Sequence, residues 1–152
     1  SSAASDVYKR QVVTQNIDGL HQLAGSKNVY ELHGSIHRNH CMRCNRFFDA
    51  EYVKNHSVIP YCPCGGMIKP DVVLYEESLD PDVLAGAVAH ISRADMLIVG
   101  GTSLQVYPAA GLINYYSGNK LVLINKTITP YDSYANLVIN DSIGKVLSAA
   151  VE

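Results

Sequence analysis

The sequence has no strong excess of charge, no long hydrophobic run and no pattern of a secretory signal peptide. Its 12 Lys and Arg residues against 14 Asp and Glu residues give a net charge of -2. The chain therefore lacks the basic character by which proteins bind nucleic acid or anionic membranes. No apolar stretch is close to the length of about 20 residues that a helix needs to span a bilayer. We expect a soluble, cytoplasmic protein that binds neither nucleic acid nor membranes.

A glycine-rich phosphate turn is also missing near the start of the chain. A dinucleotide-binding fold usually opens with a strand and such a turn, and neither precedes Val12. Residues 1–11 are small and polar and have no apolar period, so we interpret them as a non-native leader outside the fold. The alternative is a native disordered terminus. We therefore expect a fragment whose fold is incomplete at its N-terminal end.

From Val12 onward, apolar stretches of strand length alternate with stretches of helical period. The 47% of hydrophobic residues are enough for a core. The alternation predicts an α/β protein with a doubly wound parallel sheet of Rossmann-like type. Predicted strands begin at Val12 and cover residues 29–32, 94–99, 120–125 and 137–139. Predicted helices cover residues 19–24, as a short helix or turn, and residues 79–92, 109–116 and 143–150.

Polar residues follow the first predicted strand, where ligands bind in such sheets. Gln15, Asn16 and Asp18 come directly after this strand, and His33 follows the second strand. Amide and carboxylate groups can hydrogen-bond sugar hydroxyls or a carboxamide, and a histidine can act as a base near neutral pH. The alternative is a loop whose polar residues only form turns and cap a helix.

Four cysteines form two close pairs that are separated by seventeen residues. Such pairs can meet as a tetrahedral thiolate shell, for which zinc is the expected ion. The ligands are Cys41, Cys44, Cys62 and Cys64. His37 and His40 lie beside the first pair and are alternative ligands. We expect a small, structural zinc-ribbon module at residues 37–69, inserted between two parts of the Rossmann-like domain at residues 12–36 and 70–152.

Two further stretches have the character of binding segments. The strand at 94–99 is followed by a glycine turn, Gly100 and Gly101, and by a predicted helix start at Thr102 and Ser103. The backbone N–H groups of such a segment can hold a phosphate or ribose. Asn125, at the end of a later strand, suits an adenosine ribose, although it is also a common turn residue. The apolar stretch after Pro70 suits an exposed edge strand that pairs with an extended peptide, or else an ordinary strand.

Several of these motifs together resemble the sirtuins, which are NAD-dependent protein-lysine deacylases. The resemblance begins with Thr14-Gln15-Asn16-Ile17-Asp18-Gly19-Leu20-His21 and His33-Gly34-Ser35. It continues with Gly101-Thr102-Ser103-Leu104 and Val106-Tyr107-Pro108-Ala109-Ala110, and with the four cysteines. It extends from Val12 to Leu147 and lacks the N-terminal part of the sirtuin core, which holds the pyrophosphate.

The resemblance implies a role for each residue of these motifs. His33 would be the general base that activates a ribose hydroxyl. Residues implied to contact NAD are Gln15, Asn16, Asp18, Gly101, Thr102, Ser103, Asn125 and Ile143. Residues implied to bind the acylated lysine of a protein or peptide substrate are Val73, Leu74 and Tyr75. Sirtuins usually have glycine where Glu76 stands, so the peptide contact at Glu76 is expected to differ.

We therefore predict an NAD-dependent protein-lysine deacylase that contains zinc. Its products would be nicotinamide and an acylated ADP-ribose. The fragment alone is expected to be weakened or inactive. The same residues would also serve a protein ADP-ribosyltransferase. Another alternative is a module that binds NAD or ADP-ribose without catalysis. The last is a cysteine ribbon that contacts nucleic acid, which the few basic residues near it and the negative net charge disfavour.

Overall fold

The computed structural model describes residues 10–56 and 58–150. Residues 1–9, most of the predicted leader, lie outside the described residues. The chain divides after Leu84 into two compact units, residues 1–84 and 85–152. No helix in the described part of the chain is long and apolar enough to cross a membrane.

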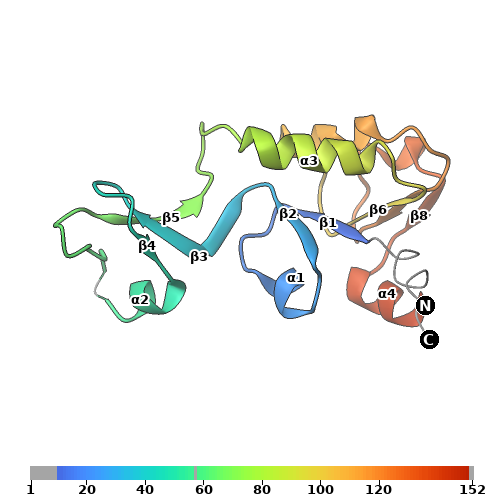
Figure 1. Cartoon of the computed structure of the whole chain (residues 1–152). Coiled ribbons are helices and arrows are strands. Elements are labelled where there is room, and N and C mark those ends of the chain that lie inside the picture. Colours follow the sequence, from blue (N-terminus) through green and yellow to red (C-terminus); the bar gives the residue numbers. More distant parts are fainter. Residues whose placement is uncertain (1–9, 57, 151–152) are drawn as a thin grey trace, which may run out of the picture. The chain divides into compact units, whose positions relative to one another are not determined.

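The first unit opens with two short parallel strands, β1 (Gln11–Thr14) and β2 (Asn28–Glu31), linked through helix α1 (Leu20–Leu23) (Figure 1). The first strand begins one residue before its predicted start, because Gln11 pairs with Asn28. The register aligns the carboxyl ends of both strands, Thr14 opposite Glu31. The polar segments that follow these strands therefore start side by side.

The rest of the first unit is an antiparallel ribbon of three strands, of which the sequence pattern predicted only the one at Pro70. Strand β3 (Gly34–Cys41) lies between β4 (Phe47–Phe48) and β5 (Ile68–Val72), and helix α2 (Ala50–Lys54) follows β4. The buried residues of β3 include Ser35 and Asn39, each 1% exposed, so the strand shows no apolar alternation. The Asn39 amide is satisfied by donating to two backbone carbonyls.

Strand β5 ends at Val72, before the apolar residues that the sequence placed in an edge strand. Val73 still donates its N–H to the carbonyl of His33 at 3.0 Å. The chain then turns, because Glu77 donates its N–H to the Leu74 carbonyl at 3.1 Å and Glu76 adopts a φ of 68°. The strand is therefore shorter than predicted, and Leu74 and Tyr75 lie on a turn.

Gly34 is expected to be the least replaceable glycine of the first unit. A Cβ at Gly34, where φ is +77°, would lie 1.9 Å from the carbonyl oxygen of Asp71, an atom of the paired strand's backbone. A Cβ at Gly25, where φ is +91°, would meet nothing within 4 Å. Gly34→Ala should therefore lower the free energy of unfolding by about 1–3 kcal/mol more than Gly25→Ala, in which only the left-handed conformation is penalised. Urea denaturation of both variants measures the difference, and equal losses would contradict the predicted clash.

The second unit contains a parallel sheet in the order β6 (Leu97–Gly100), β7 (Leu121–Ile124) and β8 (Leu137–Ile139). Its helices are most of α3 (Pro81–Ile91), the 3₁₀ helices η1 (Ala109–Tyr115) and η2 (Asp132–Tyr134), and α4 (Ile143–Ala150). A core of Leu104, Ile113, Leu121 and Leu123 packs against side chains of the sheet. Parallel strands connected through helices confirm the predicted α/β class, while η1 is a 3₁₀ rather than an α-helix.

Candidate functional site

His33 is oriented by a backbone carbonyl at the end of the first strand. Its Nδ1 lies 3.0 Å from the carbonyl oxygen of Gln15, eighteen residues away in the chain. A carbonyl oxygen only accepts, so Nδ1 carries a proton and donates it. In the neutral imidazole, Nε2 then has a free lone pair and can take a proton from a ligand. The parallel pairing of β1 and β2 thus places a half-buried base beside the polar segment.

The side-chain amides of this polar segment are free to bind a ligand. Neither Gln15 nor Asn16 makes a side-chain hydrogen bond to another described residue. Asp18 has a structural role as well, since its Oδ1 accepts from the Leu20 N–H at 3.0 Å, at the start of α1. The backbone of Asn16 is held by the Thr14 hydroxyl at 3.1 Å. A fixed backbone with unpaired amides is an arrangement that can hydrogen-bond a sugar or a carboxamide.

The predicted substrate residues begin next to His33. The backbone hydrogen bond from Val73 to the His33 carbonyl connects the two segments directly. Val73 is half-buried, whereas Leu74 is 53% and Tyr75 100% exposed. Two large apolar side chains are therefore presented to solvent close to the predicted base.

In the second unit, three of the predicted cofactor residues meet at the carboxyl ends of parallel strands. Gly100 is paired with Ile124, so Gly101 and Asn125 follow the two strands side by side. A Cβ added to Gly100 would lie 2.2 Å from Ile143 Cδ1, which places Ile143 against the same strand end. A Cβ at Gly101 would meet nothing within 4 Å. Open space therefore borders the Gly101 backbone, as close approach of a ligand requires.

Thr102 and Ser103 do not begin a helix, contrary to the sequence prediction. The Thr102 hydroxyl accepts from the Leu104 N–H at 3.2 Å and closes a tight turn, and the next helix, η1, begins only at Ala109. Ser103 is exposed. Buried Leu104, with a φ of 53°, anchors the turn in the core. Any phosphate or ribose contact at this strand end must come from the turn itself rather than from a helix N-terminus. Asn125 is also engaged, since its Nδ2 donates to the Thr127 carbonyl at 2.9 Å.

The four cysteines converge on one point of the ribbon, as predicted. Cys41 and Cys64 Sγ atoms lie 3.5 Å apart, Cys44 and Cys62 Sγ atoms 3.6 Å apart, and all four lie within 4.8 Å of one another. Sulfur ligands of a tetrahedral zinc ion, at about 2.3 Å from the metal, are about 3.8 Å from each other. None of the four is in a disulfide. The donor set and its dimensions fit a tetrahedral metal ion.

Neighbouring groups shift the pKa values of two thiols of this cluster in opposite directions. Burial disfavours the Cys41 thiolate, but hydrogen bonds from the Cys44 and Arg43 backbone and with neighbouring thiols outweigh it and lower the Cys41 pKa from 9.0 to about 6. The Cys64 backbone N–H favours the Cys62 thiolate, yet burial and the other three thiols raise the Cys62 pKa from 9.0 to about 12. Cys41 therefore ionises first of the two, and a thiolate is the form that binds a metal cation.

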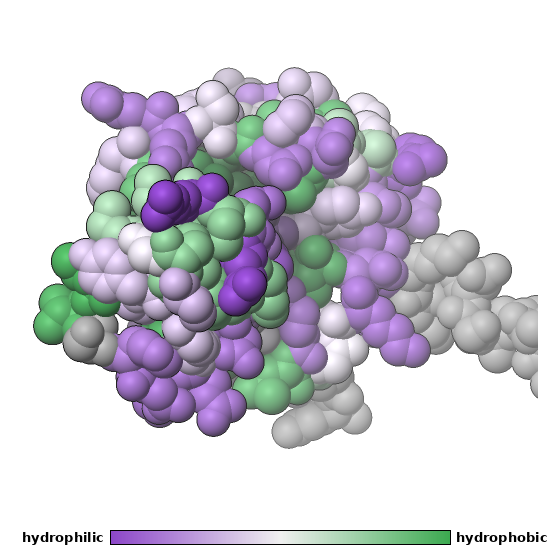
Figure 2. Space-filling model, turned by 60° about the vertical axis from the view of Figure 1, so that its left-hand side comes forward, coloured by the Kyte–Doolittle hydropathy of each residue, from purple (hydrophilic) through white to green (hydrophobic). Residues whose placement is uncertain are grey.

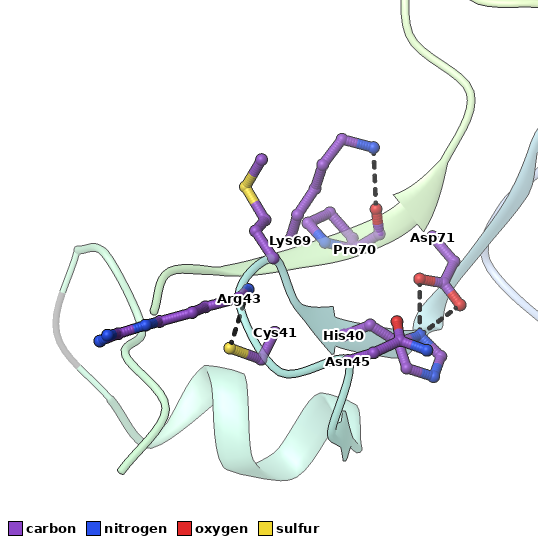
Figure 3. A pocket seen from close by; sticks show the side chains of 8 residues that line it. His40, Cys41, Arg43, Asn45, Lys69, Pro70 and Asp71 are labelled. Carbon is purple, nitrogen blue, oxygen red and sulfur yellow. Dashed lines mark hydrogen bonds and ion pairs between the residues drawn. The ribbon is translucent and has the colours of Figure 1, made fainter. Parts of the chain in front are cut away.

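Neither histidine considered as an alternative metal ligand belongs to the cluster. His37 Nε2 donates to the Asp18 carbonyl at 2.8 Å, and His40 Nδ1 lies 2.9 Å from both carboxylate oxygens of Asp71. The His40–Asp71 pair lines a cavity of about 230 Å³ on the ribbon (Figure 3). Arg43 and Lys69 also line this cavity. It is a feature of the ribbon that no motif in the sequence indicated.

Gly66 borders the cysteine cluster, and the cysteine spacing alone did not single it out. A Cβ at this position would lie 2.6 Å from Cys41 Sγ and 2.6 Å from Arg43 Cβ. Only glycine lets the second cysteine loop approach the first so closely. The signal that was available is the Gly65-Gly66 pair directly after Cys64.

The ribbon has little apolar core of its own. Its buried cluster consists of Cys41, Phe48, Cys62 and Ile68, so two of the four core residues are cysteines of the metal site. Several large apolar side chains remain exposed instead, namely Met42, Phe47, Val58, Ile59, Tyr61 and Met67. Figure 2 shows hydrophobic residues scattered among hydrophilic ones over the face it presents. A bound metal would therefore contribute much of the stability of this ribbon.

Comparison with known proteins agrees with these features. The model of the Sir2 family matches residues 3–108. The NAD-dependent protein deacetylase of Clostridium acetobutylicum is 67% identical over 144 residues, and that of Clostridium tetani is 63% identical over 145 residues. These matches cover 93% and 94% of this chain, and 59% of each relative. The chain thus spans about three fifths of the length of the curated relatives it matches.

Solved structures show the same relationship. A Sir2 structure with a p53 peptide and NAD⁺ superposes with a TM-score of 0.86 at 42% identity, covering 93% of this chain and 62% of that one. A second Sir2 structure, with the inhibitor EX-527, 2'-O-acetyl-ADP-ribose and a deacetylated p53 peptide, has a TM-score of 0.85 at 42% identity and covers 93% of this chain and 63% of that one. The fold, the cysteine cluster and both comparisons lead to one conclusion: the chain belongs to the Sir2 family.

Proposed function

We propose that this chain is part of an NAD-dependent protein-lysine deacetylase. The observation that supports the proposal best is the hydrogen bond from His33 Nδ1 to the Gln15 carbonyl, because it leaves Nε2 as a base beside two unpaired amides. Relatives that are more than 60% identical are named NAD-dependent protein deacetylases. Sir2 structures contain acetylated or propionylated peptides, which supports acylated-lysine peptides as the substrates.

In this proposal, NAD would be consumed as a second substrate. Nicotinamide would leave the ribose carbon as the carbonyl oxygen of the acyl-lysine bonds to it. Attack by a ribose hydroxyl on the acyl carbon, followed by water, would then release free lysine and an acylated ADP-ribose. Asn16 and Asp18 orient the carboxamide and the ribose, and Gln15 binds a ribose hydroxyl. His33 Nε2 takes the proton of a ribose hydroxyl, which makes that oxygen the nucleophile toward the acyl carbon. Gly101, Thr102, Ser103, Asn125 and Ile143 bind the remaining part of the dinucleotide. Val73, Leu74 and Tyr75 hold the acylated lysine.

Zinc is the metal we assign to the four cysteines. Four thiolates form a closed tetrahedral shell for zinc, which leaves no position for water or substrate. The site is therefore structural, and its ligands take no part in the chemistry. The cytoplasmic location and the lack of nucleic-acid and membrane partners stay predictions.

The test is an assay of NAD with an acetyl-lysine peptide, followed by the mass of the peptide and the release of nicotinamide. We expect deacetylation by the completed enzyme, meaning this chain extended to the length of its curated relatives, of which it covers 59%. A peptide that loses the mass of one acetyl group exchanged for hydrogen identifies a deacetylase. Gain of ADP-ribose on a protein would identify a transferase, and binding without nicotinamide release a non-catalytic module.

A further inference from the structure

The edge of β5 that faces away from β3 is protected against the addition of another strand. In the order β4-β3-β5, β5 has a neighbour on one side among the described strands. Pro70 lacks an N–H, and Lys69 Nζ donates to the Pro70 carbonyl at 3.4 Å (Figure 3). The same Nζ donates to the Val72 carbonyl at 3.3 Å. Proline and lysine at such positions prevent strand addition. A peptide is therefore not expected to add as a strand along β5, and the segment beyond Val72 is the surface it can contact next.

The residues beyond Val72 lead into a turn that holds an unusual conformation. The turn is closed by the hydrogen bond from Glu77 N–H to the Leu74 carbonyl. Its third residue, Glu76, has a φ of 68°, a left-handed conformation that favours glycine. A non-glycine residue is strained there, and strained residues are concentrated at functional sites.

The two glutamates of this turn differ in what their carboxylates do. Glu77 Oε2 accepts from the Leu74 N–H at 2.8 Å and lies 3.9 Å from Lys69 Nζ, so its charge is used within the turn. Glu76 is exposed and makes no hydrogen bond or ion pair with another described residue. A free negative charge therefore lies beside the exposed Leu74 and Tyr75.

We propose that Glu76 is a specificity-determining residue that selects acylated peptides with lysine or arginine close to the acylated lysine. The inference rests on the proposed deacetylase function and adds the class of its substrates. A peptide that contacts the exposed side chains of Leu74 and Tyr75 has its own neighbouring side chains next to the Glu76 carboxylate. A basic side chain gains an ion pair with this carboxylate, and an acidic one is repelled.

The test compares acetyl-lysine peptides that carry Arg, Gln or Glu at each of the positions flanking the acetyl-lysine. For the completed enzyme, we expect a kcat/KM about three- to tenfold higher with Arg than with Glu at the responsive position, as for a solvent-exposed charge pair. The preference should shrink at high ionic strength. Glu76→Gln should reduce it to within about twofold, because the amide keeps the shape and loses the charge.

Two further variants separate the effect of the Glu76 charge from the effect of its backbone conformation and from that of the overall charge of the protein. Glu76→Gly should lose the preference as Glu76→Gln does, and should also raise the melting temperature because it removes the left-handed strain. Glu51→Gln changes an exposed glutamate on α2 and should leave the preference as it is. If the peptides are deacetylated and Glu76→Gln leaves the preference for Arg over Glu unchanged, the inference about Glu76 is wrong, while the proposed function stands. No turnover of any peptide would overturn the proposed function, and the inference with it.

Discussion

His33→Ala in the completed enzyme is expected to lower kcat for deacetylation by about 10²- to 10⁴-fold, the usual contribution of a positioned general base. The substitution removes the nitrogen that takes the proton of the ribose hydroxyl. The Kd for NAD should change only a few-fold, because the amides and the strand ends that bind NAD in this proposal are untouched. Nicotinamide release precedes the step assigned to His33, so it should fall less than deacetylation. Steady-state kinetics with an acetyl-lysine peptide, together with NAD titration, measures these quantities.

His56→Ala is the matched control for this prediction. His56 is exposed, stacks on Tyr52 with ring centroids 3.9 Å apart, and belongs to the ribbon. The variant removes an imidazole from the same unit without touching the proposed site, and its kcat should stay near that of the parent. If His33→Ala kept the parent's turnover, His33 would not be the base.

Cys41→Ala is expected to remove bound zinc and unfold the ribbon. The substitution deletes a metal ligand and also a member of the small buried cluster with Phe48, Cys62 and Ile68. Structural zinc contributes about 10–16 kcal/mol of apparent binding free energy in small zinc modules, which equals or exceeds the typical stability of a whole domain, about 5–15 kcal/mol. We expect zinc content to fall from about one ion per chain to near zero, with a matching loss of solubility. Metal analysis and the soluble yield measure both effects.

Met42→Ala is the control for the metal site. Met42 lies next to Cys41 in the chain but is 66% exposed, so its truncation should leave zinc content and solubility near those of the parent. Treatment of the parent with a zinc chelator should reproduce the effect of Cys41→Ala. A soluble, metal-free and active Cys41→Ala variant would show that the site is dispensable.

The local sequence pattern predicted well those helices and strands whose apolar residues recur at a clear period. The last strand and the last helix have the predicted bounds, residues 137–139 and 143–150. Strand β3 was not predicted because it buries Ser35 and Asn39 instead of apolar residues. The strand at Pro70 was predicted too long. Glutamate rarely adopts a left-handed backbone conformation, so the local sequence pattern does not indicate the turn at Glu76.

In the candidate site, the residue types could be predicted from the sequence, but their hydrogen-bond partners could not. The sequence alone indicated which residues have the right chemistry, and the cysteine spacing predicted a cluster that the structure confirms. Whether a hydroxyl or an imidazole is available, however, depends on what the fold brings next to it. The Thr102 hydroxyl closes a turn, and His40 is held by Asp71 from another strand.

By itself, the sequence determined the family, the α/β class and the four cysteines that cluster, because these depend on residue types at fixed spacing. Only the tertiary structure decided how the groups are oriented. The Gln15 carbonyl assigns the proton of His33 to Nδ1. In the turn at Leu74–Glu77, the Glu77 carboxylate is hydrogen-bonded, whereas that of Glu76 has no partner among the residues that the structure describes. Hydrogen-bond partners of this kind are brought together by strand register and turn geometry, which a one-dimensional pattern does not contain.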